Sequence, residues 1–89
     1  MKKLVQVSEV ENEGMIALLG KPVMLFCLNY IYTGTLSGVN DTCVQLENAS
    51  IVYETGAFDK TSFTDAQKLP FVLYIKNSAI ESFTETNKK

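Results

Sequence analysis

Between Gly20 and Phe83 the sequence is a succession of short apolar runs separated by turn-forming residues. Such runs, bounded by Asn, Asp, Gly or Pro, are typical of β-strands. The pattern predicts five strands, at about 23–28, 32–39, 43–53, 70–75 and 79–83. The first run is apolar on both faces, which indicates a strand that is covered on both sides. We therefore expect a mainly β domain of short antiparallel strands.

Two features predict that these strands bend sharply. Gly34 and Gly38 lie inside the second strand, where glycine usually marks a bend or the close approach of another backbone. The segment 48–50 interrupts the alternation of the third strand, as a β-bulge does. Because small barrels close through such bends, we expect a strongly bent, five-stranded antiparallel SH3-like barrel over residues 21–83.

The connections are polar. Tight turns are predicted at Asn29, at 40–42 and at 76–78. The segment 55–69 contains Phe58 and Phe63 and is either a long loop or an extension of a hairpin. These two phenylalanines either dock a partner or seal the loop. Residues 84–89 are expected to form a disordered tail.

An N-terminal α-helix is predicted ahead of the strands, over about 9–19. Ser8 and Glu11 form the Ser-x-x-Glu capping box, and further acidic residues in the first turns suit the helix dipole. Gly20 fits the position just past the helix end, with Pro22 as a stop. Gly14 weakens the helix, so we expect packing against the sheet to hold it in place.

The composition excludes several classes of protein. Residues 1–89 make one domain, and 46% of them are hydrophobic, too many for a disordered chain. No apolar run approaches the ~20 residues of a transmembrane helix, and the start of the chain lacks the apolar core of a signal peptide. We therefore expect a cytoplasmic protein that has no membrane partner.

No catalytic site, cofactor or metal is expected. The chain has no histidine, no nucleophile motif and no glycine-rich phosphate loop, so an enzyme is not predicted. Cys27 and Cys43 lie in apolar stretches, which is typical of reduced, buried thiols. No further close ligand exists to complete a zinc site with them.

Two segments resemble the motifs of the Sm-like (LSm/Hfq) family. Residues 34–49 resemble the first Sm motif, Gly-x-hydrophobic-x-x-hydrophobic-Asp followed by a hydrophobic strand, and they align without a gap to its bacterial Hfq form. Residues 74–80 resemble the second motif, hydrophobic-Ile-Arg-Gly-x-x-hydrophobic. The segment 20–23, Gly-Lys-Pro-Val, matches the opening of the first strand in many members.

The binding residues of the family are kept less well than its fold residues. Asn40 stands at the aspartate of the first motif, and Thr42 stands where bacterial members carry an aromatic residue. Lys76 replaces the arginine of the second motif, which keeps the charge but loses the flat stacking surface, and Asn77 replaces the glycine. The chain therefore resembles a divergent member, of phage or bacterial origin.

The resemblance implies a homo-oligomeric ring of five to seven subunits. In the family the fourth strand pairs with the fifth strand of the next subunit, so that the open edges satisfy each other. The residues expected at that contact are Phe71, Val72, Leu73, Tyr74 and Ile75 on one edge and Ala79, Ile80, Glu81, Ser82 and Phe83 on the other.

The resemblance also implies a site for single-stranded, uridine-rich RNA at the central pore. The residues expected there are Asn40, Asp41, Thr42, Lys76, Asn77 and Ser78. Lys76 would give a ring of positive charge, and the others would supply hydrogen-bonding groups. The alternative is that they are ordinary polar turn residues, because both turns lack an aromatic stacking platform. The tyrosines at 30, 32, 53 and 74 can be interpreted as a stacking surface, but tyrosines at strand spacing are more often in cross-strand or interface packing, which is what we expect here.

The charge balance opposes generic nucleic-acid binding. The net charge is −2, so five to seven copies would carry −10 to −14 (−2 times the copy number). The chain has no arginine, the residue most often used on phosphates and guanine edges. Two hypotheses follow: an RNA-binding ring in RNA metabolism or regulation, or a structural or protein-binding ring, such as a phage assembly component, that has lost RNA binding.

Overall fold

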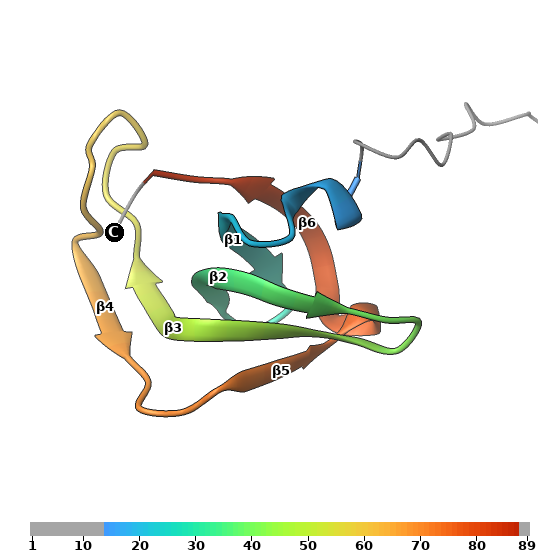
Figure 1. Cartoon of the computed structure of the whole chain (residues 1–89). Coiled ribbons are helices and arrows are strands. Elements are labelled where there is room, and N and C mark those ends of the chain that lie inside the picture. Colours follow the sequence, from blue (N-terminus) through green and yellow to red (C-terminus); the bar gives the residue numbers. More distant parts are fainter. Residues whose placement is uncertain (1–13, 88–89) are drawn as a thin grey trace, which may run out of the picture.

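The computed structural model describes residues 14–87, which form a six-stranded antiparallel sheet with almost no helix (Figure 1). The strands are β1 (Pro22–Cys27), β2 (Ile31–Val39), β3 (Cys43–Glu54), β4 (Asp65–Lys68), β5 (Leu73–Lys76) and β6 (Ile80–Glu85). Two single-turn 3-10 helices, η1 (Ile16–Leu18) and η2 (Asn77–Ala79), precede β1 and β6. The prediction of a mainly β, antiparallel fold is confirmed. Within residues 14–87 no helix has the length and apolar character needed to cross a membrane.

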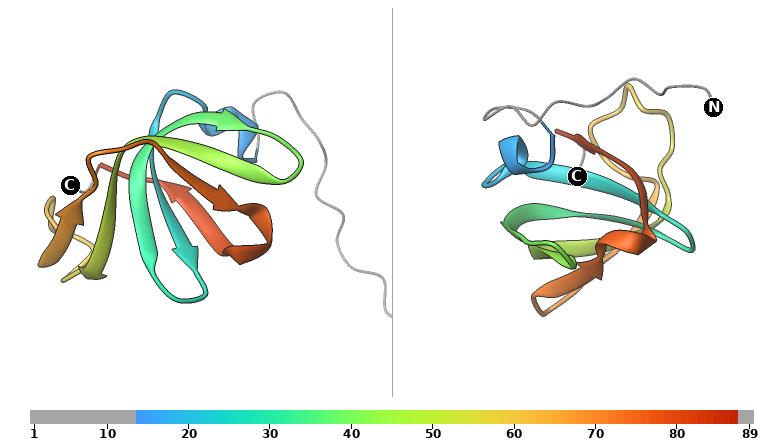
Figure 2. Two further views of the ribbon diagram at one scale, coloured as in Figure 1. Left: turned by 90° about the horizontal axis from the view of Figure 1, so that it is seen from below. Right: turned by 90° about the vertical axis from the view of Figure 1, so that its right-hand side faces the viewer.

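The strands follow the order β4-β3-β2-β1-β6, and β5 pairs with β3 beside β4. The long strand β3 therefore has β2 on one edge and two short strands on the other. The sheet is strongly curled (Figure 2). The short helix η2 connects β5 to β6. The Leu28 N–H donates to the Ala79 carbonyl at 3.1 Å, which ties η2 to the β1–β2 connection.

A bulge bends the β2–β3 pair beside Gly34. The register shifts there because β3 carries one extra residue, and Asn48 in that stretch has a φ of 53°. A Cβ at Gly34 would lie 2.9 Å from the Glu47 carbonyl oxygen and 3.1 Å from the Ala49 Cα. The predicted irregularity at 48–50 and the predicted close approach at Gly34 are both confirmed.

The core lies inside the curl of the sheet. Alternation along β3 sends Val44 and Leu46 inward, and β1 is buried over three consecutive residues, Val23 to Leu25. The buried cluster consists of Val23, Leu25, Leu36, Val44, Leu46, Ala49 and Ile75, with Met15 and Leu18 packed against it from the η1 turn. Each fully buried aliphatic side chain contributes about 1.5–3 kcal/mol, so this cluster is the main source of stability.

The expected helix over 9–19 is not present in the part of the chain that the structure describes. Residues 9–13 lie outside that part. From Gly14 onward the chain forms only η1, and Gly14 has a φ of 75°, in the left-handed region that an α-helix cannot use. Met15 and Leu18 still cover the core, so one turn does part of the packing expected of the helix.

The structure decides between the two alternatives for the segment 55–69, which is a hairpin extension because β4 pairs with β3. The expected number of strands is corrected, since β4 makes six strands instead of five. The expected tail does not begin at Thr84, because β6 continues to Glu85 against β1 and the Thr86 N–H donates to the Pro22 carbonyl at 2.9 Å. Residues 88–89 lie outside the described range.

Candidate functional site

The turn 40–42 and the segment 76–78 lie against each other at one end of the sheet. Cys43 at the start of β3 is opposite Lys76 at the end of β5, so the ladder brings the two connections together. The Asn77 N–H donates to the Thr42 carbonyl at 2.9 Å, and the Asn77 Nδ2 donates to the Asn40 carbonyl at 2.9 Å. All the residues that the two motifs predicted for one site are therefore neighbours in the fold.

Asn40 shapes the first turn. Its Oδ1 accepts hydrogen bonds from the Thr42 N–H at 2.8 Å, the Thr42 hydroxyl at 3.0 Å and the Cys43 N–H at 2.9 Å. The Asn40 N–H also donates to the Cys43 carbonyl at 3.0 Å. A carboxylate would accept the same bonds, so asparagine preserves the turn that the aspartate of the motif would form.

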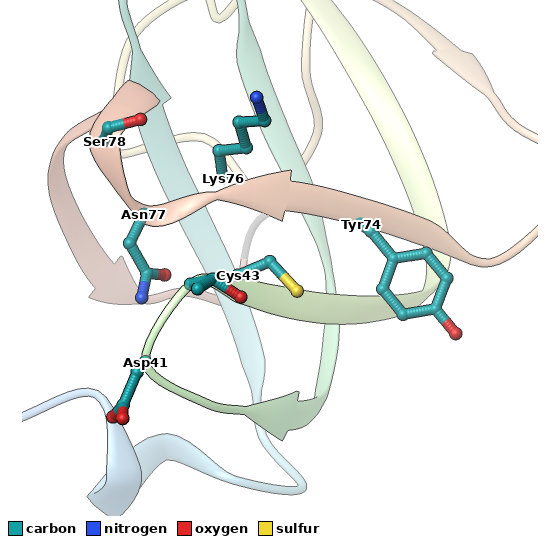
Figure 3. Close-up of a pocket in the computed structure, with 7 residues that line it drawn as sticks. Asp41, Cys43, Tyr74, Lys76, Asn77 and Ser78 are labelled. Carbon is teal, nitrogen blue, oxygen red and sulfur yellow. The ribbon is translucent and has the colours of Figure 1, made fainter.

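The two turns border an open hollow of about 670 Å³, which we call the turn hollow (Figure 3). Its lining residues are Asp41, Thr42, Cys43, Tyr74, Lys76, Asn77 and Ser78. Of the six predicted site residues, only Asn40 does not line the hollow. Asn40 instead stabilises the turn through the hydrogen bonds that its Oδ1 accepts. Cys43 and Tyr74 were not predicted for this site, because the two motifs point only to the turns.

The register of β3 and β5 explains why Tyr74 belongs to the turn hollow. Gln45 is opposite Tyr74 and Cys43 is opposite Lys76, while the intervening pair, Val44 and Ile75, is buried. Side chains alternate between the two faces of a strand. The two pairs on either side of the buried one, Gln45 with Tyr74 and Cys43 with Lys76, therefore share the outer face of the sheet. The spacing of two between Tyr74 and Lys76 is the sequence signal that identifies this shared face.

Lys76 is an available cation at this face. Its side chain is exposed, and it forms no ion pair with any residue from 14 to 87, where the one salt bridge joins Lys21 to Glu85 at 3.9 Å. Asp41 is also exposed and places an acidic group on the same hollow. The arrangement suits a ligand that has both an anionic group and hydrogen-bond donors, and it does not suit a simple polyanion.

The expected interface residues lie along the two sheet edges that have no partner in the described part of the chain. On the β5 side, Phe71, Val72 and Tyr74 are exposed, and on β6 Phe83 is 39% exposed. Leu73, Ala79 and Ile80 instead pack against the core, Ile75 is buried, and Glu81 and Ser82 are exposed and polar. An edge contact would therefore use backbone groups together with the four exposed apolar side chains.

Three tyrosines pack with one another away from the turn hollow. The ring centroid of Tyr30 lies 6.2 Å from that of Tyr32 and 6.4 Å from that of Tyr53, both in edge-to-face geometry. The Tyr53 hydroxyl donates to the Gln67 Oε1 at 3.2 Å. The predicted cross-strand packing holds for these three. Tyr74 forms no ring pair with them, although it lines a second hollow of about 330 Å³ together with Tyr30, Tyr32 and Lys76. In the β3–β4 loop Phe58 is exposed and Phe63 is half-buried.

Both cysteines are free and half-buried. Burial raises the pKa of the Cys27 thiol, and the nearby Glu81 carboxylate raises it further. Among residues 14–87 there is no group of three or more His, Cys, Asp or Glu side chains that could hold a metal ion. Comparisons of this chain with family models, with curated proteins and with solved structures find no match.

Proposed function

We propose that this chain assembles into a cytoplasmic homo-oligomeric ring of the Sm-like type and binds single-stranded RNA at the turns 40–42 and 76–78. The observation that carries the proposal is the turn hollow. Two segments that resemble the two Sm motifs, far apart in sequence, are joined there by hydrogen bonds. They share one open cavity with Lys76, which forms no ion pair within residues 14–87. The pairing of β3 with β5 brings the two turns together, and the side chain of Asn77 adds a hydrogen bond to the Asn40 carbonyl.

The two open edges of the sheet support the ring. In the family the fourth strand pairs with the fifth strand of a neighbour, and here β5 and β6 are the corresponding strands. Each is paired on one side only, to β3 and to β1. Phe71, Val72 and Tyr74 are exposed on the β5 side and carry no charge, whereas β6 exposes Phe83 between Glu81 and Glu85. A monomer normally protects such edges with charge, so the uncharged β5 edge is the stronger support. Closing the edges around a ring would place one Lys76 from every subunit near a common axis.

The chemistry of the turn hollow supports single-stranded RNA as the ligand. Lys76 offers a positive charge to a phosphate, and Asp41, Asn77 and Ser78 offer acceptors and donors to base edges and to the 2′-hydroxyl. An unpaired strand exposes the Watson–Crick edges of its bases to such short side chains, which a duplex does not. The net charge of −2 makes binding depend on these local contacts, so we expect the affinity to fall with salt in proportion to the number of phosphates that Lys76 side chains contact.

Titration of labelled oligo-uridine by fluorescence anisotropy, at low and moderate salt, tests the proposal. We expect Lys76→Ala to weaken binding and to reduce the slope of log affinity against log salt by about 0.7 for each phosphate that the lysine neutralises. Lys68→Ala is the matched control, since it removes the same charge from an exposed position on β4, outside the hollow. Absence of binding at low-micromolar protein would refute the RNA proposal, and equal effects of the two substitutions would remove the site from the turns.

A structural or protein-binding ring is the second candidate. The acidic balance of the chain and the exposed Phe58 on the β3–β4 loop favour it. A particle with the mass of a ring that fails to bind any oligonucleotide would support this candidate over the first.

A further inference from the structure

Tyr74 presents an aromatic ring to the turn hollow. Its side chain is 63% exposed on the outer face of β5, two residues before Lys76. We propose that Tyr74 is the stacking platform for a base held in the turn hollow, so that each subunit binds one nucleotide between Tyr74 and Lys76. The inference rests on the proposed function. It adds an aromatic residue that stacks on the base, because neither turn contains one.

The strand geometry sets the spacing of this site. Residues two apart on one face of a strand are separated by about 6.6 Å, twice the rise per residue. This is the scale that separates a base from its own phosphate within one nucleotide. A base lying on the Tyr74 ring thus leaves its phosphate within reach of the flexible Lys76 side chain. In Figure 3 the Lys76 and Tyr74 side chains leave β5 in different directions, with Cys43 on the neighbouring strand between them, so Lys76 would turn toward the ring to meet the phosphate.

Tyr74 differs from the other tyrosines in being unengaged. The rings at 30, 32 and 53 pack together, and the Tyr53 hydroxyl is hydrogen-bonded. Within residues 14–87 Tyr74 has neither a ring partner nor a hydrogen bond through its hydroxyl. A large aromatic side chain left in water gives up the burial that normally stabilises it, which is expected where the ring serves a ligand.

Stacking on Tyr74 has a consequence for ligand choice. Every base offers a π-face, so a platform of this kind tolerates any base. The turn hollow should therefore hold adenine as well as uracil, and the contribution of Tyr74 should be present with both. This separates the inferred site from a pocket that reads uracil by its edge groups alone.

Oligonucleotide titrations of Tyr74→Leu and Tyr74→Phe test the platform. Stacking is worth about 1–3 kcal/mol per base, so we expect Tyr74→Leu to weaken oligo-uridine and oligo-adenosine binding by roughly 5-fold to 150-fold. Tyr74→Phe should bind as the wild type does. The slope of affinity against salt should stay unchanged in Tyr74→Leu, in contrast to Lys76→Ala, because no charge is removed. Tyr53→Leu is the control, a tyrosine of similar exposure on β3.

An abasic strand of equal length isolates the stacking contact. It has no base to stack, so the wild type and Tyr74→Leu should bind it equally. A penalty of the same size with the abasic strand would overturn the platform, because the substitution would then act through the fold or through assembly. Light scattering on Tyr74→Leu shows directly whether its particle mass is that of the wild type.

Ultraviolet cross-linking of the wild-type complex is a second readout that needs no substitution. Trypsin releases residues 69–76 as one peptide between Lys68 and Lys76, and Tyr74 is its single tyrosine. We expect the nucleotide adduct on Tyr74 in this peptide. Binding that disappears in Lys76→Ala but is unchanged in Tyr74→Leu, with no adduct on Tyr74, would refute the platform and leave the proposed function standing. Absence of wild-type binding would refute both.

Discussion

Cys27 is a residue whose acidity the fold lowers. Burial of the thiol, followed by the charge of Glu81, raises the pKa of Cys27, and burial likewise raises the pKa of the neighbouring Tyr32. The folded state thus holds both protons more tightly than the unfolded chain does. This contribution to stability is fully present below the unfolded pKa values and is lost as the pH rises through the folded values.

We therefore predict that the free energy of unfolding falls as the pH is raised through about 8.5, where an unfolded cysteine ionises. Urea unfolding at a series of pH values, followed by circular dichroism, measures the effect. Glu81→Gln should lessen the loss, since it removes one cause of the raised Cys27 pKa. Stability that is flat or increasing across this alkaline range would contradict the prediction.

The bend between β2 and β3 is the element on which the curl of the sheet depends. A side chain at Gly34 would meet the backbone of the bulge at Glu47 and Ala49, which cannot move without opening the ladder. At Gly38 a Cβ would meet only the Gln45 side chain, at 3.3 Å from its Oε1. Both glycines lie in β2, so the two positions are a matched pair that differs in what surrounds them.

We predict that Gly34→Ala lowers the free energy of unfolding by about 1–3 kcal/mol, the usual cost of forcing extra volume into a packed site. Gly38→Ala should cost clearly less, because the Gln45 side chain can rotate away. Urea midpoints of the two variants and the wild type give the comparison. Equal losses would show that the bulge does not constrain Gly34.

The elements that could be predicted from the sequence are those with a local signal. β1 and β2 were found as runs between turn-forming residues, β3 was found through apolar alternation, and the bulge was found where that alternation is interrupted. β4 was missed because Asp65–Lys68 is exposed throughout and carries no alternation of apolar residues. The extension of β6 to Glu85 depends on pairing with β1, which is distant in sequence. The helix expectation failed from Gly14 onward because a capping pattern does not fix the φ that this glycine adopts.

The candidate site could be predicted from the sequence only in part. The two turns were identified by their motif resemblance, and the structure places them together. Whether Cys43 and Tyr74 belong to the site depends on which face of β3 and β5 is buried. That face is set by the register of the two strands and not by composition. Tyr74 was assigned to cross-strand or interface packing in preference to a stacking surface, whereas its ring lines the turn hollow.

At the scale of the whole molecule, the proposed ring makes a prediction about mass. Light scattering should give a particle of five to seven times the 9.9 kDa of one chain. The double variant Phe71→Lys with Phe83→Lys should shift the population to monomer, since charge on both edges opposes strand pairing. Phe58→Lys is the control, because Phe58 is at least as exposed but lies outside the edge strands. A wild-type chain that stays monomeric at every concentration would end the ring proposal.

The outer side of β3 is not covered by one continuous strand. β4 and β5 are each four residues long, and the stretch around Pro70 between them belongs to neither. Proline has no N–H to offer and fixes the local backbone, so an approaching chain meets two short ladders instead of a straight template. Open-ended fibrillar growth needs a long flat template. The interruption at Pro70 therefore allows a neighbour to dock while denying the uninterrupted surface on which amyloid would propagate.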